Sequence, residues 1–496
     1  MSRLPASFTP LLLLDSSRGR PMYRQLYDWL RQAIVDGQMR PGQRVPSTRS
    51  LAAELKISRI PVFNAYEQLW AEGYLETFVG AGTCVARSIP DQELSALRRK
   101  ESPGARKTDA EARPRRISHR AATLTSQSPQ PWLNSLCAFR VSLPALDHFP
   151  VRIWSKLSAR HSRMLAPETM AYGNAMGHLP FREAVARYLA TARGVRCEPS
   201  QVLVTTGSQQ ALQMCAQVLM DPDDGVGIEE PGYPGARQAF LSAGSRLIPV
   251  PVDEEGVKVT ELTRRSRNLR VVYITPSHQY PLGMAMSATR RMQLLNWAAR
   301  NGTWILEDDY DSEYRFGTRP IVSLQGLDKY ARVIYIGTFS KVLFPALRLG
   351  YLVVPKDLIP AFSAYRDAAD IFCSTLCQAV LTDFIEEGHF ARHIRRMRML
   401  YMERRSLLVN TLDAQMGKTL QVTGAEAGMH LVALLPSGLD DTAIAQRAAE
   451  RGISTMPLSS CYLQRPAVNG LILGYGGTNG QQIKQAVHEL KEIVRA

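Results

Sequence analysis

Apolar side chains recur at regular steps near the start of this chain. Between residues 22 and 37 they return every three or four positions, which predicts an amphipathic helix that ends at Gly37. The same spacing predicts a short helix over residues 48–55 and, after a break, a third helix with Ser58 as its N-cap. Strict alternation on either side of the turn at residues 80–82 then predicts a β-hairpin over residues 74–86. The residues on the three helical apolar faces are Tyr23, Leu26, Tyr27, Leu30, Ile34, Leu51, Ala52, Leu55, Val62, Tyr66 and Leu69.

Helix, short helix, turn, helix and hairpin is the order of a winged helix-turn-helix domain. Such a domain places the second helix of the pair in the DNA major groove, with the first residues of that helix toward base edges. We therefore expect Ser58, Arg59 and Asn64 to face bases. The other candidates lie where phosphates would approach the preceding segment and the hairpin turn: Arg44, Thr48, Arg49 and Gly82. A helical hairpin used for protein contacts stays open as the alternative to DNA binding.

Two short apolar runs further along, at residues 304–306 and 333–336, predict buried strands. Each run is followed by residues that can do chemistry: Glu307, Asp308, Asp309 and Tyr310 after the first, and Thr338, Ser340, Lys341 and Arg348 after the second. In a parallel α/β sheet, ligands bind at the carboxyl ends of strands. The two segments are therefore expected to line one crevice.

The residue types in this crevice suit one kind of cofactor. A lysine can form a Schiff base with an aldehyde such as that of pyridoxal 5'-phosphate. An acid that faces the pyridine nitrogen keeps it protonated, so that the ring accepts electrons, and an arginine binds the phosphate through charge-assisted hydrogen bonds. A surface lysine beside a solvated acidic run is the alternative for Ser340-Lys341 alone, and the combination with Asp308 and Arg348 argues against it.

Charge and composition predict the kind of partner and the cellular compartment. The 496 residues carry a formal charge of +15, and residues 1–120 hold 20 Lys and Arg against 12 Asp and Glu, which suits a polyanionic partner. Seven scattered cysteines without a CxxC pair indicate neither a zinc site nor a disulfide scaffold, so we expect a soluble cytoplasmic protein. Residues 88–135 lose periodicity and are rich in arginine, proline and serine, which predicts a basic flexible linker. We thus expect a DNA-binding domain at 18–87 and a cofactor domain at 136–496.

Two motifs of the second domain resemble a known family. The runs EDDYDSEYRF (residues 307–316) and GTFSKVLFPALRLGY (residues 337–351) resemble the aspartate and lysine motifs of fold-type I aminotransferases. They are similar in particular to the aminotransferase-like half of MocR-type regulators, a branch of the GntR superfamily. The run PGQRVPSTRSLAAEL (residues 41–55), with the segments that follow it, likewise resembles the GntR-type DNA-binding domain.

The resemblance implies a fold, a cofactor and roles for single residues. The fold is α/β, with an N-terminal winged helix-turn-helix, a large parallel or mixed sheet domain, and a smaller C-terminal α+β subdomain. Lys341 would form the internal aldimine with pyridoxal phosphate, Asp308 would meet the pyridine nitrogen, and Tyr310 would meet the ring hydroxyl. The other residues implied at the cofactor are Thr338, Ser340, Arg348, Ser208 and Gln209 around the phosphate, Tyr233 stacked on the ring, and Tyr172 reaching the neighbouring subunit's phosphate.

Some positions depart from the family pattern. Leu471 and Ile472 stand where class I aminotransferases usually have an arginine for the substrate carboxylate, and Arg237 or Arg465 is a candidate replacement. Ile60 and Pro61 replace the usual Asn-Thr in the reading helix.

Two hypotheses follow. The first is a homodimeric transcriptional regulator that binds repeated operator half-sites and senses an amine, an amino acid or pyridoxal phosphate through Lys341. The alternative is an active aminotransferase with an appended DNA-binding domain. The intact reading helix and the missing arginine favour the regulator.

Overall fold

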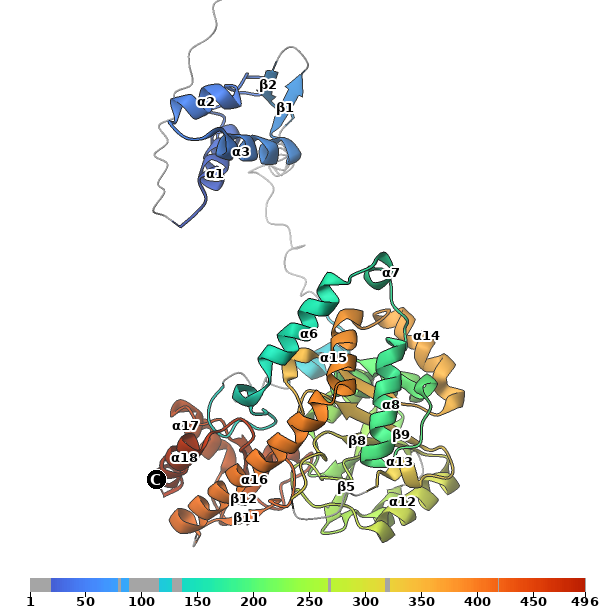
Figure 1. Cartoon of the computed structure of the whole chain (residues 1–496). Helices are drawn as coiled ribbons and strands as arrows, with labels where there is room; N and C mark the ends of the chain where they lie inside the picture. The colour runs from blue at the N-terminus through green and yellow to red at the C-terminus, as the bar shows by residue number, and fades with distance from the viewer. Residues whose placement is uncertain are drawn as a thin grey trace, which may run out of the picture. The chain divides into compact units, whose positions relative to one another are not determined.

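The computed structural model describes residues 19–78, 82–88, 116–126, 136–265, 269–316, 322–417 and 419–495. The chain divides into two compact units between Arg116 and Ile117 (Figure 1). None of the described helices is both long enough and apolar enough to cross a membrane.

The first unit is built from three helices and a hairpin. Its elements are α1 (Met22–Val35), α2 (Thr48–Glu54), α3 (Arg59–Ala71), β1 (Leu75–Phe78) and β2 (Gly82–Val85), and the two strands pair antiparallel. The predicted order of elements is confirmed. Leu26, Leu30, Leu51, Val62 and Leu69 are nearly inaccessible to solvent and form the core with their neighbours. Ser58 is the N-cap of α3, as predicted, although its side chain makes no capping hydrogen bond; Ser47 does cap α2, accepting from the Ser50 N–H at 3.0 Å.

The second unit contains a sheet of eight strands. Their order across the sheet is β3 (Val202–Thr205), β10 (Gly350–Val353), β9 (Val333–Thr338), β8 (Trp304–Asp309), β7 (Leu269–Ile274), β4 (Gly225–Glu230), β5 (Arg246–Asp253) and β6 (Gly256–Val257). Strands β9, β8, β7, β4 and β5 are parallel, whereas β10 and β6 are antiparallel to their neighbours. The sheet is thus mixed, with a parallel centre.

Helices cover both faces of this sheet, because successive strand residues point to opposite sides. On β8, Leu306 packs in a cluster with residues of α9 and α10, whereas Ile305 packs in a cluster with residues of α12. The α-helices that precede β10 in the chain are α5 (His119–Ser126), α6 (Val151–Arg163), α7 (Pro167–Met170), α8 (Leu179–Arg193), α9 (Ser208–Leu219), α10 (Pro234–Ser242), α11 (Val259–Arg265), α12 (Ala288–Asn301) and α13 (Leu324–Leu327).

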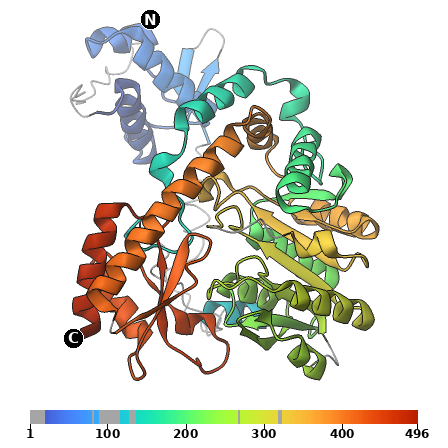
Figure 2. The same cartoon turned by 60° about the horizontal axis from the view of Figure 1, so that its bottom comes forward.

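A smaller antiparallel sheet follows near the C-terminus. Its strand order is β11 (Gln421–Thr423), β12 (His430–Leu434), β14 (Gly470–Gly474) and β13 (Met456–Pro457). Leu431 and Leu473 pack with α16 and α18, while Val432 and Ile472 face Tyr280 of the large sheet domain. Figure 2 shows this sheet in red between those helices and the rest of the unit. The remaining helices are α14 (Ile359–Ala369), α15 (Thr375–Glu386), α16 (His389–Met416), α17 (Asp441–Glu450) and α18 (Gly480–Arg495).

Two predictions from periodicity need correction. The strands predicted at 304–306 and 333–336 extend to Asp309 and Thr338, because β8 and β9 stay paired as far as Asp309 and Gly337. The carboxylates at the end of β8 did not end the strand, since each accepts a hydrogen bond on at least one oxygen. Within the predicted linker 88–135, residues 119–126 form a helix, α5, that packs against α10. Residues 89–115 and 127–135 of that interval lie outside the described residues.

Candidate cofactor site and DNA-binding surface

The carboxyl ends of the parallel strands meet around one enclosed cavity. It is lined by residues at the ends of β7 and β8, residues that follow β3, β4, β7, β8 and β9, and one residue from the segment before α6: Ser208, Tyr233, Tyr273, Thr275, Tyr280, Asp308, Tyr310, Lys341 and Ser142. Five of these were predicted from the sequence, namely Ser208, Tyr233, Asp308, Tyr310 and Lys341. The structure brings these five together.

Lys341 lies just beyond β9, and its Nζ donates a hydrogen bond to the Ser142 carbonyl oxygen at 3.3 Å. Burial lowers the pKa of the Lys341 ammonium to about 8; Asp311 and Asp308 oppose this shift, and the positive charges of Arg140 and Arg348 add to it. A lower pKa leaves a larger fraction of the amine neutral near pH 7, and the neutral amine is the form that attacks an aldehyde. The environment of Lys341 is therefore suited to covalent attachment of a carbonyl compound.

Asp308 has one carboxylate oxygen engaged and one without a partner. The Tyr273 hydroxyl donates to Oδ2 at 2.8 Å, while Oδ1 is buried and accepts no hydrogen bond from any described residue. Burial raises the pKa of Asp308 to about 7. A buried acceptor without a donor is costly, and a protonated pyridine nitrogen would supply both the donor and the positive charge. This orphaned oxygen fits the pyridine end of pyridoxal phosphate.

Tyr310 belongs to a buried hydrogen-bonded chain. Its hydroxyl lies 3.0 Å from His278 Nδ1, and the same nitrogen lies 2.9 Å from Asp311 Oδ1. His430 lies beside this chain, its ring centroid 5.1 Å from that of His278, and burial lowers the pKa of His430 to about 4. His278, Asp311 and His430 offer ligand atoms within 4.8 Å of one another, and the His278–Asp311 hydrogen bond already uses two of these groups. The chain holds the Tyr310 hydroxyl in the cavity.

The candidate phosphate end lies at the start of α9. Gly207 has φ +111°, and a side chain there would come within 3.3 Å of the Arg348 guanidinium, so Ser208 and Arg348 lie at the same helix N-terminus. Unpaired N–H groups and the helix dipole at such an end favour an anion. Gln209 instead donates its side-chain N–H to the Gly235 carbonyl at 2.9 Å, which leaves its backbone N–H as the group available to an anion.

The other predicted phosphate residues lie in the turn after β9. Thr338 accepts a hydrogen bond through Oγ1 from the Ser340 N–H at 3.2 Å, and both side chains are buried. This bond shapes the turn that presents Lys341.

The two predicted tyrosines differ in position. Tyr233 caps α10 and lines the cavity, with its ring edge-on to Tyr280 at 5.4 Å between centroids. Tyr172 is 81% exposed, and its ring centroid lies 6.1 Å from that of Phe372. It does not line the cavity of its own chain. Its predicted role toward a neighbouring subunit requires a second chain.

Several residues at the cavity were not singled out from the sequence. Ser142 lines the cavity from the segment before α6, Arg140 of the same segment acts on Lys341 through its charge, and Tyr273 near the end of β7 donates to Asp308. Nothing in the local pattern marks Arg140, because it precedes Lys341 by 201 positions.

Neither proposed replacement for the carboxylate arginine lines the cavity. The Arg237 guanidinium is held by the carbonyls of Tyr462 at 2.9 Å and Ser460 at 3.3 Å, and Arg465 is exposed. Ile472 is fully buried within β14. Arg140 and Arg348 are the arginines whose charges act on Lys341, and Arg348 is the one at the N-terminus of α9.

In the first unit, the predicted DNA contacts gather on α2, α3 and the hairpin. Ser58, Arg59 and Asn64 are exposed at the start of α3, and Arg49 is exposed on α2. The Arg59 Nε donates to Thr48 Oγ1 at 3.1 Å, which links the two helices of the pair. Gly82, with φ +82°, begins β2, and a side chain there would lie 3.0 Å from the Arg44 guanidinium. The unit thus exposes Arg49 and Arg59 on the helix pair and Arg44 beside the start of β2.

The same helix exposes apolar side chains. Ile60 is 70% exposed and Phe63 is 47% exposed. Exposed apolar residues at this position suit contact with a thymine methyl group, which is a normal means of base recognition in the major groove.

Comparison with known proteins shows the same two parts. Residues 22–85 match the family described as bacterial regulatory proteins of the gntR family, and residues 146–488 match aminotransferase class I and II. The chain is 40% identical over 98% of its length to the probable rhizopine catabolism regulatory protein MocR of Rhizobium meliloti, of which it covers 96%. It is 31% identical to the HTH-type pyridoxine biosynthesis transcriptional regulator PdxR of Corynebacterium glutamicum, with 95% of each chain covered.

A solved structure shares the fold of the second unit. The crystal structure of LysN, an α-aminoadipate aminotransferase from Thermus thermophilus complexed with N-(5'-phosphopyridoxyl)-L-leucine, superposes with a TM-score of 0.71. The two are 30% identical, and the match covers 76% of this chain and 97% of LysN. The predicted fold class and the predicted cofactor, pyridoxal 5'-phosphate, are confirmed at the level of the family. With its gntR-family DNA-binding unit and its aminotransferase-like unit, this chain belongs to the MocR-type transcriptional regulators.

Proposed function

We propose that this regulator binds a repeated operator as a homodimer and that a small molecule reaching Lys341 controls the binding. The observation that carries the proposal is the buried, unpaired Oδ1 of Asp308 in a cavity that also holds the Lys341 amine. Such a pair suits a ligand with a protonated ring nitrogen at one end and a carbonyl group nearby.

When bound, pyridoxal phosphate would supply an aldehyde for Lys341 and an electron-withdrawing ring. Asp308 would accept the hydrogen bond of the ring nitrogen and keep it protonated, because a neighbouring cation favours the ionised carboxylate. Tyr310, held by His278 and Asp311, would donate to the ring oxygen. The N-terminus of α9 with Ser208 and Arg348 would hold the phosphate.

The effector would act at the same amine. Lys341 is a primary amine with a lowered pKa, so an incoming amine or amino acid can displace it from a carbonyl partner, while pyridoxal phosphate itself would occupy the site directly. Arg140 is the cationic side chain placed to favour an effector with a carboxylate, since its charge acts on Lys341. We propose an amino acid, an amine or the cofactor as the effector on these grounds.

A second subunit would complete the site. Tyr172 is exposed and lies on the loop after α7, outside the cavity of its own chain. Two subunits would also present two reading helices, which matches an operator of repeated half-sites. A DNA-binding regulator acts where the operator lies, and this supports a cytoplasmic location.

The test is covalent trapping. Purified protein incubated with pyridoxal phosphate and reduced with borohydride should carry the label on the peptide that contains Lys341, as mapped by mass spectrometry. The isosteric Asp308→Asn variant should bind the cofactor about 10- to 100-fold more weakly, because a hydrogen bond to a charged group contributes roughly 1.5–3 kcal/mol. A label on another lysine, or equal affinity in Asp308→Asn, would refute the assignment.

A further inference from the structure

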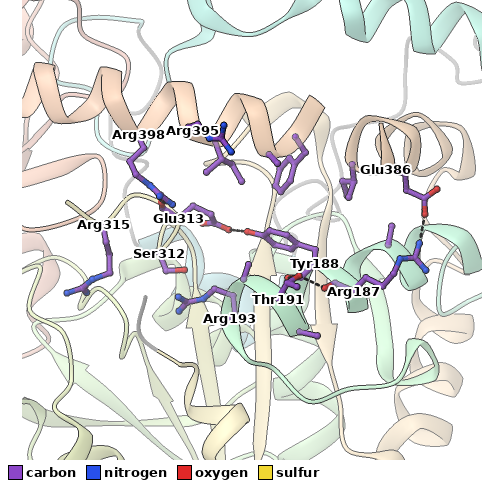
Figure 3. Close-up of a pocket in the computed structure, with 17 residues that line it drawn as sticks. Arg187, Tyr188, Thr191, Arg193, Ser312, Glu313, Arg315, Glu386, Arg395 and Arg398 are labelled. Carbon is purple, nitrogen blue, oxygen red and sulfur yellow. Dashed lines mark hydrogen bonds and ion pairs between the residues drawn. The ribbon is translucent and has the colours of Figure 1, made fainter. Parts of the chain in front are cut away.

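A second cavity of about 830 Å³ lies in the aminotransferase-like unit, and it shares no lining residue with the cavity at Lys341. It is formed by the second half of α8, the end of α15, the first turns of α16, and the segment that follows Asp311 (Figure 3). Its volume lies within the range of small-molecule sites, roughly 300–1,000 Å³. All of its walls belong to one compact unit.

The charged part of the lining is dominated by arginine. Five arginines line the cavity, against two glutamates: Arg187, Arg193, Arg315, Arg395 and Arg398, with Glu313 and Glu386. Figure 3 shows Arg395 and Arg398 extending from α16 on the side where Glu313 meets Tyr188. The lining thus carries an excess of positive charge.

Local carboxylates neutralise two of the five arginines and leave Arg395 and Arg398 without an ion pair among the described residues. Arg187 pairs with Glu386, and Arg193 pairs with Asp309 outside the lining. Among the described residues, Arg398 donates only to the Glu313 backbone carbonyl, at 3.1 and 2.9 Å. Arg395 has no hydrogen bond or ion pair with any residue in the described ranges, and it is exposed.

The negative charge of the lining is smaller than two glutamates would give, because Glu313 is partly protonated near pH 7. Its carboxylate accepts a hydrogen bond from the Tyr188 hydroxyl at 2.7 Å, and burial raises its pKa to about 7. A fraction of this carboxyl is therefore neutral at pH 7. An anion that enters beside it meets less repulsion than the sequence suggests.

Apart from Thr191 and Ser312, the uncharged lining is aliphatic or aromatic. Phe390 and Ile394 of α16 face Ala184 and Tyr188 of α8, and the Tyr188 and Phe390 rings meet edge to face at 5.2 Å between centroids. An arginine-rich end joined to an apolar wall matches a ligand with an anionic head and a hydrocarbon or aromatic body.

We propose that this cavity is a second ligand site, which binds a small organic anion through Arg395 and Arg398 and buries its apolar body against Phe390 and Ile394. The head would be a carboxylate, sulfonate or phosphate, because arginine binds all of these through paired hydrogen bonds. The site adjoins the segment that carries Asp308, because the Arg193 Nε of its lining donates a hydrogen bond to Asp309 Oδ2 at 2.7 Å. A ligand in this cavity would thus be linked to the cofactor site through the Arg193–Asp309 hydrogen bond, since Asp309 follows Asp308 in β8.

The test uses naphthalene-2-sulfonate as a probe, with the full-length protein first loaded with pyridoxal phosphate at Lys341 and then freed of unbound cofactor by gel filtration, so that excess cofactor does not compete for the second cavity. Isothermal titration should give one site per chain with a Kd near or below about 1 mM. The uncharged 2-naphthalenemethanol should bind at least about fivefold more weakly, because it lacks the charge-assisted hydrogen bonds.

Arg395→Glu locates the site, and Arg300→Glu is the matched control. Both arginines are exposed on helices and both changes alter the net charge equally, but Arg300 lies on α12 outside the cavity. Arg395→Glu should weaken probe binding at least about fivefold, as expected for a reversed charge close to the anion. Arg300→Glu should change it less than twofold. No binding to the wild type up to about 5 mM, or equal loss in the two variants, would overturn the proposal.

Discussion

The buried ion pair between Arg193 and Asp309 offers a sharp test of how the segment around Asp308 is held. The Arg193 side chain is 4% exposed and that of Asp309 is 2% exposed, with Nε and Oδ2 2.7 Å apart. Arg193→Met keeps most of the side-chain volume and leaves the Asp309 charge buried with the Tyr335 hydroxyl. Breaking a buried pair in this way costs roughly 3–5 kcal/mol of unfolding free energy.

An exposed pair on the same helix provides the control. Arg187 and Glu386 also form an ion pair, but their side chains are 60% and 47% exposed. Arg187→Met should therefore cost only about 0–1 kcal/mol, because water screens the pair and solvates the remaining glutamate. Comparing Arg193→Met with Arg187→Met, both on α8, thus separates the effect of burying the ion pair on stability from the effect of losing an arginine.

The measurement is urea denaturation of the cofactor-free protein, followed by fluorescence. With a slope of about 3 kcal/mol per M, Arg193→Met should lower the midpoint of the aminotransferase-like unit by roughly 1 M or more. The double variant Arg193→Met with Asp309→Asn should recover at least about 1 kcal/mol, because a neutral unpaired amide costs less than an unpaired charge. Equal midpoints for the two single variants, or a double variant less stable than Arg193→Met, would refute this reasoning.

Three further predictions concern the cofactor cavity and the reading helix. Burial raises the pKa of Asp308 to about 7. In the cofactor-free protein, protonated Asp308 therefore contributes to the free energy of unfolding fully below about pH 4, and this contribution is lost as the pH rises through 7. Asp308→Asn should flatten this part of the stability–pH curve, and an unchanged curve would contradict the assignment. Lys341→Ala should keep operator binding in a gel shift but lose the effector response, normally a 5- to 150-fold change in affinity, and loss of all DNA affinity in a folded dimer would contradict the sensing model. Arg49→Ala should weaken binding to every DNA sequence and lower the salt slope by about one, whereas Arg59→Ala should reduce discrimination at one base position by roughly 1–3 kcal/mol. Replacing one thymine by uracil in the operator should weaken binding only while Ile60 is present. Identical effects of the two arginine variants on operator and random DNA would contradict this division.

The sequence alone determined the local elements and the order of the motifs. The three- and four-residue apolar step is a property of a single helix, so α1, α2 and α3 could be predicted without knowing what they pack against. Lys341 and Asp308 could be placed at one crevice for a similar reason, because the carboxyl ends of adjacent parallel strands lie at the same edge of a sheet.

The tertiary structure decided which distant residues complete each site. Ser142 and Tyr273 reach Lys341 and Asp308 from segments 199 and 35 positions away, and no periodic pattern marks either one. Likewise, Arg395 lines an arginine-rich cavity only because α16 packs near α8 and the segment after β8. Spacing along a chain specifies which face of an element is apolar, whereas the choice of neighbouring element depends on the packing of whole faces. The charge environment of Lys341, which sets its chemistry, is a product of that packing.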